Sequence, residues 1–497
     1  MGTEGHEEFD VVVVGGGPGG STLGTLVAMQ GHDVLLLEKE TFPRYQIGES
    51  LLPSTIHGVC RMTGATDKII DAGFMLKHGG TFRWGANPEP WTFSFSVSPR
   101  TAGPTSTAFQ VERSKFDKIL LDNAAEKGVQ VRQQASVQNV VEEDGRVVGV
   151  VYTDASGERH EVRAKWVVDA SGNRSGIHKA VGGKREYSDF FRSLALFGYF
   201  ENGKRMAEPT SGNILCVAFD SGWFWYIPLS DTLTSVGVVV RHDMAEKIQG
   251  DPEKALNSLI AECPMIKDFL SDATRVTTGQ YGEIRVRKDY SYRQTKFWKP
   301  GLVLVGDAAC FVDPVFSSGV HLATYGALLA ARSINSVLAG TVDQEKAFEE
   351  FEARYVREYS VFYEFLMSFY DMHVDEDSYF WSAKKVTQNQ YGELESFVDL
   401  VAGVSSAEFG LNDAESAALR FKKASAEFAG AVDAMAAEGD SMVPLFKSSV
   451  VRQAMQESGQ VQGRALLGAD LGPDTPMFPG GLVTSDDGML WQAPAQG

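Results

Sequence analysis

Two apolar runs near the start of the chain are separated by a glycine-rich turn and a segment with helical periodicity. The first run, Val11–Val14, leads directly into glycines that end at Gly20, and the helix that follows is predicted to reach about Gln30. The second run, Val34–Leu37, ends at the acidic residue Glu38. The order of strand, glycine turn, helix, strand and acid predicts a βαβ unit that binds a dinucleotide.

The glycines of this turn have different tasks in such a unit. Gly15 permits the tight turn, Gly17 lets the backbone approach a pyrophosphate, and Gly20 lets the helix pack on the strand. The N-terminus of the helix offers unpaired N–H groups to the phosphates. Glu38 is placed to accept hydrogen bonds from a ribose, and its charge would repel a 2′-phosphate, which disfavours NADP.

Alternating and helical apolar patterns predict short strands and two helices in the next part of the chain. The helices are expected near Ser54–Met62 and over Arg113–Gly128. This mixture of strands and helices predicts an α/β fold. The strands are expected at Phe74–Trp84, Trp91–Phe95, Val129–Arg132, Val137–Glu142, Val147–Thr153, Glu161–Arg163 and Trp166–Asp169.

The stretch between Phe190 and Val240 is rich in strand patterns. We interpret it as the antiparallel sheet of a substrate-side unit, interleaved in the chain over about residues 185–275 and followed by a helix around Asp251–Glu262. Its strands are expected at Ser193–Phe200, Ile214–Phe219, Trp223–Pro228 and Ser235–Arg241.

Helical patterns dominate the rest of the chain. A strand at Leu302–Val305 returns to the nucleotide-binding layer, and a helix follows over Gly319–Leu338. Asp343 opens a longer helix in which aromatic residues recur every three or four positions. Such a stripe indicates a buried face more than a ligand site. The stripe consists of Phe348, Phe351, Tyr355, Tyr359, Phe362, Leu366 and Phe369.

Two regions are expected from these patterns. A nucleotide-binding core with the interleaved sheet is expected over residues 1–345, and a helical C-terminal region over residues 346–497. Within the second region, helix is predicted from Glu395 to about Glu457, and the glycine- and proline-rich tail from Gly468 is predicted to be irregular.

Composition narrows the functional class. The 497 residues carry a formal net charge of −19, with a pI near 5.0, which argues against nucleic acid or an anionic membrane as the main partner. The acidic N-terminus lacks the apolar core of a signal peptide, and no apolar run reaches the length of a membrane span. We therefore expect a cytoplasmic protein.

The four cysteines support the same compartment. Cys60, Cys216, Cys263 and Cys310 lie far apart, without the spacing of a zinc site. They are predicted to be free thiols in a reducing environment, and no metal site is indicated.

Two motifs far from the N-terminus indicate the chemistry. Trp223–Pro228 reads WFWYIP, and Phe311–Gly319 reads FVDPVFSSG directly after Gly306-Asp307. With the opening glycine turn and Lys77, these motifs resemble WxWxIP and FxxPxxSxG of the FADH2-dependent halogenases. The resemblance covers roughly residues 9–382. It implies the p-hydroxybenzoate-hydroxylase-like, monooxygenase-like FAD-binding fold with a helical C-terminal addition.

The resemblance also implies a reaction. FADH2 from a separate flavin reductase reacts with O2 to a flavin hydroperoxide, and chloride held by the backbone of Ser318 and Gly319 gives HOCl. Lys77 carries or orients this oxidant toward the substrate, while Trp223 and Trp225 separate flavin from substrate and suppress hydroxylation. The protein is thereby expected to be a halogenase of antibiotic or other natural-product biosynthesis. We interpret it as a chlorinase, although the sequence does not decide between chloride and bromide.

A set of FAD contacts follows from the same resemblance. Asp307 is expected at the ribityl chain and Arg113 at the phosphates. The whole implied set is Gly15, Gly17, Pro18, Gly20, Ser21, Glu38, Arg44, Ser50, Arg113, Asp307, Pro314, Gly319 and Val320.

Simpler interpretations exist for the same residues. Without the motifs, Lys77 would be interpreted as a solvated surface lysine, and the two tryptophans as ordinary core residues of one strand face. His321, in the first turn after Gly319, is predicted to be structural.

One departure from the family bears on the substrate. Tryptophan halogenases of the family carry a glutamate just before the serine of FxxPxxSxG, whereas this chain has Phe316, which cannot act as a general base. A phenol or pyrrole, which stabilises its own cationic intermediate, needs such a base less. The domain that carries Ile227 and the aromatic C-terminal helices resemble the phenol-type branch, several members of which act on carrier-tethered acyl groups.

An acyl or peptidyl carrier protein is therefore a candidate partner. Carrier proteins are acidic, so docking on a chain of this charge needs a local basic face. The residues offered for it are Arg285, Arg287, Lys288, Arg293, Lys296 and Lys299, although a solvated connection explains them equally well.

Three other functions remain open from the sequence. A phenol hydroxylase would bind NAD(P)H itself and need no halide. A geranylgeranyl-reductase-like ene reductase would consume no O2. A flavin-binding interaction protein would show no turnover, and changing Lys77 would have no effect.

Overall fold

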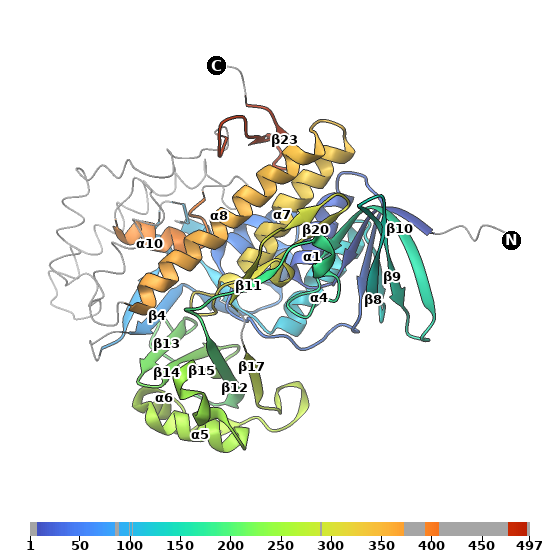
Figure 1. Cartoon of the computed structure of the whole chain (residues 1–497). Coiled ribbons are helices and arrows are strands. Elements are labelled where there is room, and N and C mark those ends of the chain that lie inside the picture. The colour runs from blue at the N-terminus through green and yellow to red at the C-terminus, as the bar shows by residue number, and fades with distance from the viewer. Residues whose placement is uncertain are drawn as a thin grey trace.

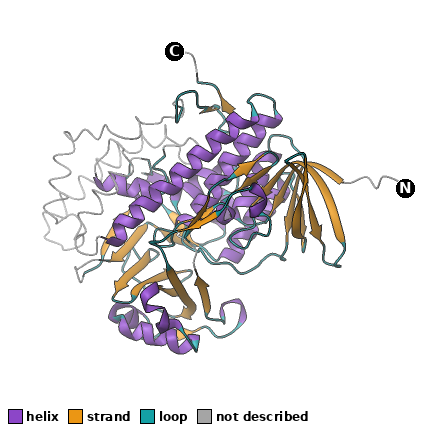
Figure 2. Ribbon diagram, viewed as in Figure 1, coloured by secondary structure: helices purple, strands orange, loops and turns teal. Residues whose placement is uncertain are grey.

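The computed structural model describes residues 7–84, 89–98, 100–101, 103–288, 291–371, 393–406 and 476–494. Two large sheets divide the molecule, and the long helices α7 and α8 cross the first of them (Figures 1 and 2). The helices are α1 (Pro18–Ala28), α2 (Cys60–Met62), α3 (Thr66–Asp71), α4 (Arg113–Glu126), α5 (Pro252–Glu262), α6 (Pro264–Phe269), α7 (Ser318–Leu338), α8 (Gln344–Asp371) and α10 (Glu393–Val401), with a π-helix at Ser54–Val59.

The first sheet is the predicted nucleotide-binding layer. Its central order is β19-β20-β10-β1-β2-β7, with β8 and β9 extending it beside β10. Strand β1 pairs in parallel with both β2 and β10, and its apolar run Val11–Val14 is buried, as is typical of parallel sheets that are covered on both faces. The strands are β1 (Glu7–Val14), β2 (Val34–Glu38), β7 (Gln130–Gln133), β8 (Ser136–Glu143), β9 (Arg146–Thr153), β10 (Arg159–Asp169), β19 (Trp298–Lys299) and β20 (Leu302–Leu304).

One strand of this sheet is longer than predicted. The separate strands expected at Glu161–Arg163 and Trp166–Asp169 are a single strand, β10. Its first half pairs antiparallel with β9, and its second half pairs in parallel with β20. Lys165, the exposed residue between the two predicted segments, faces solvent without interrupting the strand.

The second sheet is the predicted substrate-side sheet, but it recruits strands from outside the predicted range. Its order is β16-β12-β15-β14-β13-β4-β5, with β17 also paired to β12. The four strands predicted for this unit pair antiparallel with one another, as expected, whereas β4, which comes from outside the predicted range, joins β13 in parallel. The strands are β4 (Gly79–Arg83), β5 (Trp91–Ser94), β12 (Ser193–Glu201), β13 (Ile214–Phe219), β14 (Gly222–Pro228), β15 (Leu233–Arg241), β16 (Thr274–Arg275) and β17 (Arg285–Lys288).

The two faces of this sheet pack on different cores. Phe224 and Tyr226 of β14 join a small core between the sheet and helices α5 and α6, which lie at the bottom of Figure 1. Trp223 and Trp225 point the opposite way, into the main core that the sheet shares with the first sheet. This alternation confirms that β14 presents both tryptophans on one face.

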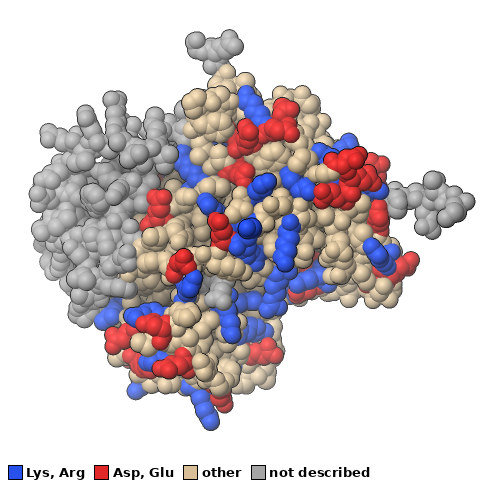
Figure 3. Space-filling view, in the orientation of Figure 1, with Lys and Arg blue, Asp and Glu red and all other residues tan. Residues whose placement is uncertain are grey.

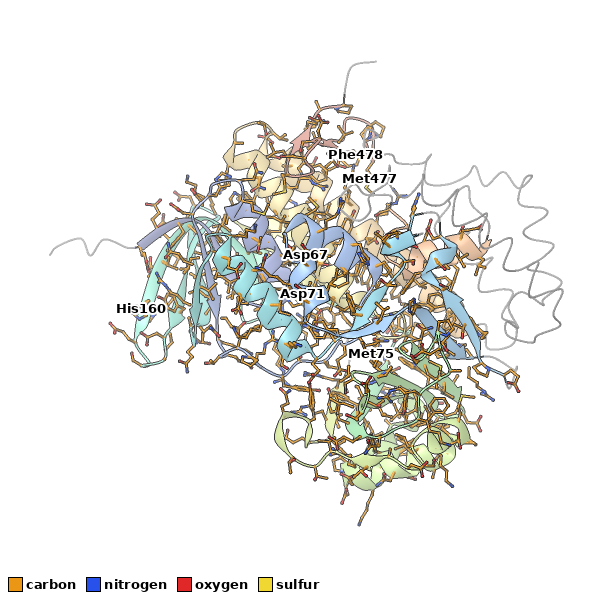
Figure 4. All side chains as sticks on the ribbon, turned by 180° about the vertical axis from the view of Figure 1, so that it is seen from behind. Asp67, Asp71, Met75, His160, Met477 and Phe478 are labelled. Carbon is orange, nitrogen blue, oxygen red and sulfur yellow. The ribbon has the colours of Figure 1, made fainter. Side chains whose placement is uncertain are left out.

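Smaller sheets of two or three strands accompany the two large ones within the described residues. Strand β3 begins at Met75, which Figure 4 shows from behind where the two parts of the molecule meet. The remaining strands are β3 (Met75–Lys77), β6 (Ala108–Gln110), β11 (Arg185–Tyr187), β18 (Tyr292–Gln294), β21 (Cys310–Phe311), β22 (Val483–Thr484) and β23 (Trp491–Gln492).

The aromatic stripe of α8 is core, as predicted. Every residue of the stripe, from Phe348 to Phe369, is buried. Rings of the first sheet stack on it; for example, the centroids of Trp166 and Phe348 lie 4.3 Å apart. Asp343 accepts hydrogen bonds from the first N–H groups of the helix, as a helix N-cap does.

The C-terminal expectations need correction. Helix α10 ends at Val401, and Gly403 with φ of +74° forms the turn after it, so the predicted helix does not continue through residues 402–406. Its predicted continuation over residues 407–457 lies outside the described residues. The end of the tail is docked: Trp491 donates to Ser333 Oγ (2.8 Å) and the Arg332 guanidinium donates to the Gly488 carbonyl (2.7 Å).

No helix within the described part of the chain is both long and apolar enough to cross a membrane.

Candidate functional site

A cavity of about 380 Å³ lies beyond the carboxyl ends of β1 and β20, where the two large sheets meet. Its walls come from the glycine turn, loops 44–50 and 170–174, strands β12 and β14, and the N-terminus of α7. Ligands of open α/β sheets bind at this end of the strands. The predicted cofactor residues that line the cavity are Gly15, Gly17, Pro18, Glu38, Arg44, Ser50, Arg113, Asp307, Pro314, Gly319 and Val320.

Gly15 and Gly20 hold the turn together, whereas Gly17 leaves room for a ligand. Gly15 has φ of +104°, and a Cβ there would lie 2.6 Å from the Ala170 carbonyl oxygen. A Cβ on Gly20 would lie 1.9 Å from the Gly15 oxygen, so Gly20 packs the turn and does not line the cavity. Among the described residues, a Cβ on Gly17 would approach only Arg44, at 3.5 Å. The space beside Gly17 suits the close approach of a pyrophosphate.

Glu38 shapes the turn as well as lining the cavity. Its carboxylate accepts hydrogen bonds from the N–H groups of Gly16 (2.7 Å) and Glu40 (2.8 Å), and each oxygen keeps a free lone pair for a ribose hydroxyl. Ser21, predicted to contact the cofactor, instead donates to the Gly16 carbonyl (3.0 Å) from a buried position outside the cavity lining.

Asp117 joins two arginines at the cavity wall. Arg44 donates to it at 2.7 Å, and Arg113 donates to both of its oxygens at 2.7 and 2.9 Å. Burial disfavours the charge of Arg113, but the carboxylate of Asp117 outweighs this effect and raises the arginine pKa. Arg113 also donates to the Ile47 carbonyl (2.6 Å), so this predicted phosphate contact is largely occupied by protein groups.

Replacing Asp117 by alanine is expected to destabilise the protein by ~3–5 kcal/mol, because two poorly exposed guanidinium groups would lose their carboxylate. Asp122→Ala on the same helix is the control. Asp122 pairs with Lys118 in solvent (2.6 Å), and its loss should cost ~0.5 kcal/mol or less. Urea unfolding measures both, and equal losses would show that Asp117 does not anchor the cavity wall.

Lys77 is buried, so the interpretation as a solvated surface lysine is wrong. Its amine donates to Ser50 Oγ and to the Leu51 carbonyl, both at 2.9 Å, and lies 5.4 Å from the centre of the Phe95 ring. Burial lowers its pKa to about 7, and the neighbouring Cys216 thiol opposes this only weakly. Lys77 does not line the cavity itself; Ser50 stands between the amine and the cavity.

Trp223 and Trp225 form part of the cavity wall formed by the second sheet. Trp225 donates to Ser235 Oγ (3.2 Å), and its ring covers Gly237 on the neighbouring strand, where a Cβ would lie 2.1 Å from the indole. Glycine at position 237 is therefore what lets the indole lie flat on the sheet. The ring of Trp223 contacts Trp84 (centroids 6.0 Å apart), so the two predicted tryptophans extend from the cavity into an aromatic cluster.

Helix α7 begins within the FVDPVFSSG segment, and the N–H groups of its first turn point toward the cavity. These groups have no intrahelical acceptors. Ser317 has φ of +61°, and both it and Gly319 line the cavity, whereas Ser318 is fully buried behind them. A Cβ on Gly319 would lie 2.9 Å from the Phe311 ring. The arrangement suits a small anion held by backbone N–H groups.

Phe316 lies in a cluster of packed rings. It contacts Phe82, Phe365, Phe369 and Phe397, with centroids 4.7 to 6.1 Å apart. Its apolar surroundings agree with the prediction that position 316 supplies no general base.

Ring contacts connect this cluster to Lys77. They run from Phe316 through Phe397 of α10 and Phe93 to Phe95, which lies beneath the Lys77 amine. An aromatic wall therefore separates the lysine from position 316.

Asp307 lies where the resemblance expects the ribityl chain. Burial raises its carboxyl pKa to about 6, while Arg113, Arg287 and Arg185 favour its charged form. Tyr292 donates to its backbone carbonyl (2.5 Å), which fixes the loop after β20.

Several lining residues are not among the implied FAD contacts. They include Tyr45, Glu49 and Arg287, together with residues 171–174 after β10. Glu49 precedes Ser50, which belongs to the implied FAD contacts, but no motif in the sequence analysis singled out Glu49 itself.

Two polar clusters lie outside the cavity lining. His321 is buried as predicted for a structural histidine, between Ser54 Oγ (2.9 Å) and Glu358 Oε1 (2.8 Å). Asp154, in the turn after β9, and His160, near the start of β10, are hydrogen-bonded (2.8 Å) at one end of the β9–β10 pair; Figure 4 labels His160.

Comparison with known proteins gives consistent results. The sequence profile of the tryptophan halogenase family matches residues 10–103 and 97–428. A tryptophan 2-halogenase from Chondromyces crocatus is 32% identical over 414 residues, which cover 82% of this chain and 77% of that protein.

Solved structures extend the similarity to the whole chain. The myxobacterial chondrochloren halogenase CndH, described as a variant of FAD-dependent halogenases, aligns with a TM-score of 0.75 and 50% identity over 98% of this chain and 100% of its own. The flavin-dependent brominase Bmp2 aligns with a TM-score of 0.69 and 28% identity, covering 85% and 99%.

Proposed function

This chain belongs to the tryptophan halogenase family and is a flavin-dependent halogenase, and from that premise we propose that it chlorinates an electron-rich phenol or pyrrole. The observation that carries the proposal is the buried amine of Lys77, held by cavity-lining Ser50 and bordered by aromatic rings. Family membership also decides against the hydroxylase, ene-reductase and non-catalytic alternatives.

The enzyme uses FAD, reduced by a partner flavin reductase, and the cavity has the features that this cofactor needs. We assign the pyrophosphate to the space beside Gly17 and the N-terminus of α1, and the ribityl chain to Asp307. The halide is assigned to the backbone of Ser318 and Gly319. Bound FADH2 supplies two of the four electrons that reduce O2 and chloride the other two, giving FADH2 + O2 + Cl⁻ + H⁺ → FAD + HOCl + H2O.

Lys77 directs the oxidant toward the substrate in this proposal. With a pKa lowered to about 7 by burial, both its charged and neutral forms are available near neutrality. The charged amine donates a hydrogen bond to HOCl, whereas the neutral amine forms a chloramine, R–NH2 + HOCl → R–NHCl + H2O. Substitution of the ring then follows HOCl + ArH → ArCl + H2O for free oxidant, or R–NHCl + ArH → R–NH2 + ArCl for the chloramine, which restores the amine.

Trp223 and Trp225 separate the flavin cavity from the place where the substrate ring binds. Both indoles are buried and both line the flavin cavity, so the substrate ring is excluded from direct contact with the cofactor. This separation supports halogenation in place of hydroxylation.

The substrate class follows from Phe316. Without a carboxylate at this position, a ring that stabilises its own positive charge is favoured. We further propose that the ring is presented on an acidic carrier protein. On the face seen in Figure 3, basic side chains gather between the two lobes, in the region of β11 and β17.

The proposed docking face is smaller than the sequence indicates. Arg285 pairs with Glu283 and Lys299 pairs with Glu142. Lys288, Arg293 and Lys296 form no ion pair within the described part of the chain, so they carry the proposed contact.

The test offers phenolic and pyrrolic acids, each free and as its carrier-protein thioester, with tryptophan as the reference substrate. With FADH2, O2 and chloride, the expected product of a thioester shows the two-isotope pattern of chlorine in its mass spectrum. Chlorination of tryptophan alone would overturn the substrate class. Efficient chlorination of free acids, with none of the thioesters, would overturn tethering.

Charge reversal tests the docking face separately. Arg293→Glu with Lys296→Glu should raise the KM for the thioester, while kcat stays unchanged. The control, Lys254→Glu with Lys267→Glu, makes the same charge change at exposed positions on α5 and α6. An equal KM in both double variants would remove the docking face from the proposal.

A reducing compartment is proposed on the same footing. The four cysteines are all free and buried, in keeping with a cytoplasmic enzyme supplied by a diffusible reductase.

A further inference from the structure

A buried carboxyl group in the cavity wall has no part in the function proposed so far. Glu49 lines the cavity and is only 2% exposed. Its Oε1 accepts a hydrogen bond from the Tyr199 hydroxyl at 2.7 Å. Its Oε2 has no hydrogen-bond partner among the described residues. A buried carboxyl oxygen without a partner is costly, which points to a ligand or a proton at this position.

The Glu49 carboxyl is connected to the edge of the cavity by two tyrosines. The hydroxyls of Tyr199 and Tyr45 lie 2.8 Å apart. Because the single proton of Tyr199 points to Glu49, Tyr45 is the donor to Tyr199. Tyr45 is only half-buried, and its ring lies against the Arg285 guanidinium (3.8 Å from the ring centre). The carboxyl–tyrosine–tyrosine chain therefore leads from the buried wall toward solvent.

The surroundings hold Glu49 close to its titration point. Burial raises the pKa of Glu49 to about 7. Tyr199, the nearby Ser235 hydroxyl and Arg113 favour the charged carboxylate, whereas Glu112 disfavours it.

Other ionisable groups also lie near the Glu49–Tyr199–Tyr45 relay. Tyr281 packs on Tyr199 and donates to Glu112 (2.7 Å), while Arg285 and Arg287 act on Tyr45. Asp307 also lines the cavity, but three arginines favour its charge, so it is a poorer proton store than Glu49.

We propose that Glu49 holds the proton that the flavin cavity consumes in each turnover, and that Tyr199 and Tyr45 replace it from solvent. The balance above takes up one H⁺ for each HOCl formed. Glu49 gives its proton from Oε2, then receives the Tyr199 proton on Oε1. Tyr199 takes the proton of Tyr45, and Tyr45 takes H⁺ from solvent, so every hydroxyl is restored. Rotation of the carboxyl group then returns its proton to the Oε2 position. This inference rests on the proposed placement of FAD in the cavity.

Proton uptake on binding of oxidised FAD is the decisive measurement, because it needs neither O2 nor halide. Isothermal titration calorimetry of FAD binding near pH 7, in two buffers of different ionisation enthalpy, gives the number of protons taken up. Bound FAD removes more water from Glu49 and raises its pKa further, so the wild type should take up protons. Glu49→Gln should lose this uptake while still binding FAD. Because Asp307 is present in both proteins, the difference between their proton uptakes reports on Glu49 alone.

Variants of the tyrosines test the relay. Tyr199→Phe removes a hydrogen bond that favours the carboxylate, so the pH midpoint of uptake should move upward. With reductant, O2 and chloride, Glu49→Gln and Tyr199→Phe should each form product on the order of 10- to 100-fold more slowly. Tyr281→Phe is the matched control, because the Tyr281 hydroxyl donates to Glu112 and is not part of the Glu49–Tyr199–Tyr45 relay. This variant should behave as the wild type.

Wild-type proton uptake in Glu49→Gln would overturn the proposal, and an unchanged midpoint in Tyr199→Phe would overturn the relay. Failure of the chlorination proposal can be distinguished from failure of the proposed role of Glu49. A wild type that binds FAD with proton uptake but makes no chlorinated product keeps Glu49 in its role, whereas FAD binding without uptake contradicts the role of Glu49 alone.

Discussion

Lys77→Met should abolish halogenation, lowering the rate at least about 100-fold, while FAD binding and oxidation of FADH2 by O2 continue. The amine is separated from the cavity by Ser50, so its loss removes the group that handles the oxidant without touching the flavin wall. Methionine fills a similar volume beside Phe95, which keeps the site packed. The measurements are chlorinated product by mass spectrometry, FADH2 oxidation by absorbance and release of H2O2. Full chlorination by this variant would remove Lys77 from the mechanism.

The same variant has a pH signature that reports on folding. The pKa of Lys77 is about 7 in the folded protein and near 10.5 when exposed. Between these values the unfolded chain binds more protons than the native one, so the contribution of Lys77 to stability rises with pH across this window. Lys77→Met lacks this slope. Its melting temperature relative to the wild type should therefore be highest below about pH 7 and fall as the pH rises toward 10.5. A pH-independent difference would contradict the buried environment of the amine.

Gly17→Val should weaken FAD binding by about 100-fold or more, near the upper end of what overpacking of ~1–3 kcal/mol produces. The side chain would fill the space beside the glycine turn where the pyrophosphate is assigned. Because the φ of Gly17 is ordinary and its Cβ would make no closer contact than 3.5 Å, the fold should persist. Fluorescence titration with FAD and a circular dichroism melt measure the two properties.

Gly24→Ala in the same helix is the control for that experiment. Its Cβ would make only ordinary contacts, the nearest at 3.5 Å from Val129, and alanine favours the helix by about 0.5–1 kcal/mol. This variant should bind FAD normally and unfold at a slightly higher temperature. If Gly17→Val bound FAD as tightly as Gly24→Ala does, the pyrophosphate would have to lie elsewhere.

Local signals made the first sheet predictable from the sequence. The apolar run of β1, the glycine turn and the acid at the end of β2 follow each other within about 30 residues, and each has one simple structural meaning. The same holds for α8, whose aromatic stripe has helical spacing. Where the signal is periodic and local, pattern and structure agree.

Contacts between distant segments were not predictable in this way. The parallel pairing of β4 with β13 leaves no mark on either strand, since neither GGTFR nor ILCVAF carries a signal for its partner. Burial of Lys77 depends on the loop 49–51 closing over it, and the role of Asp117 depends on Arg44, which lies far away in sequence. Docking of the tail depends on Trp491 reaching α7. A single sequence gives the type of such residues but not their partners.

The parallel pairing of β4 with β13 also has a consequence during synthesis on the ribosome. Gly80 pairs with Ile214, roughly 130 residues later in the chain, and at about 5–20 residues per second the earlier strand waits on the order of ten seconds for its neighbour. During this time the hairpin of β4 and β5 carries Phe82, Trp91 and Phe93, all buried in the finished protein, without the strand that covers its edge. Nascent chains are therefore most prone to aggregate in this interval. The yield of recombinant enzyme should respond more to chaperones acting on the emerging chain than to the stability of the finished fold.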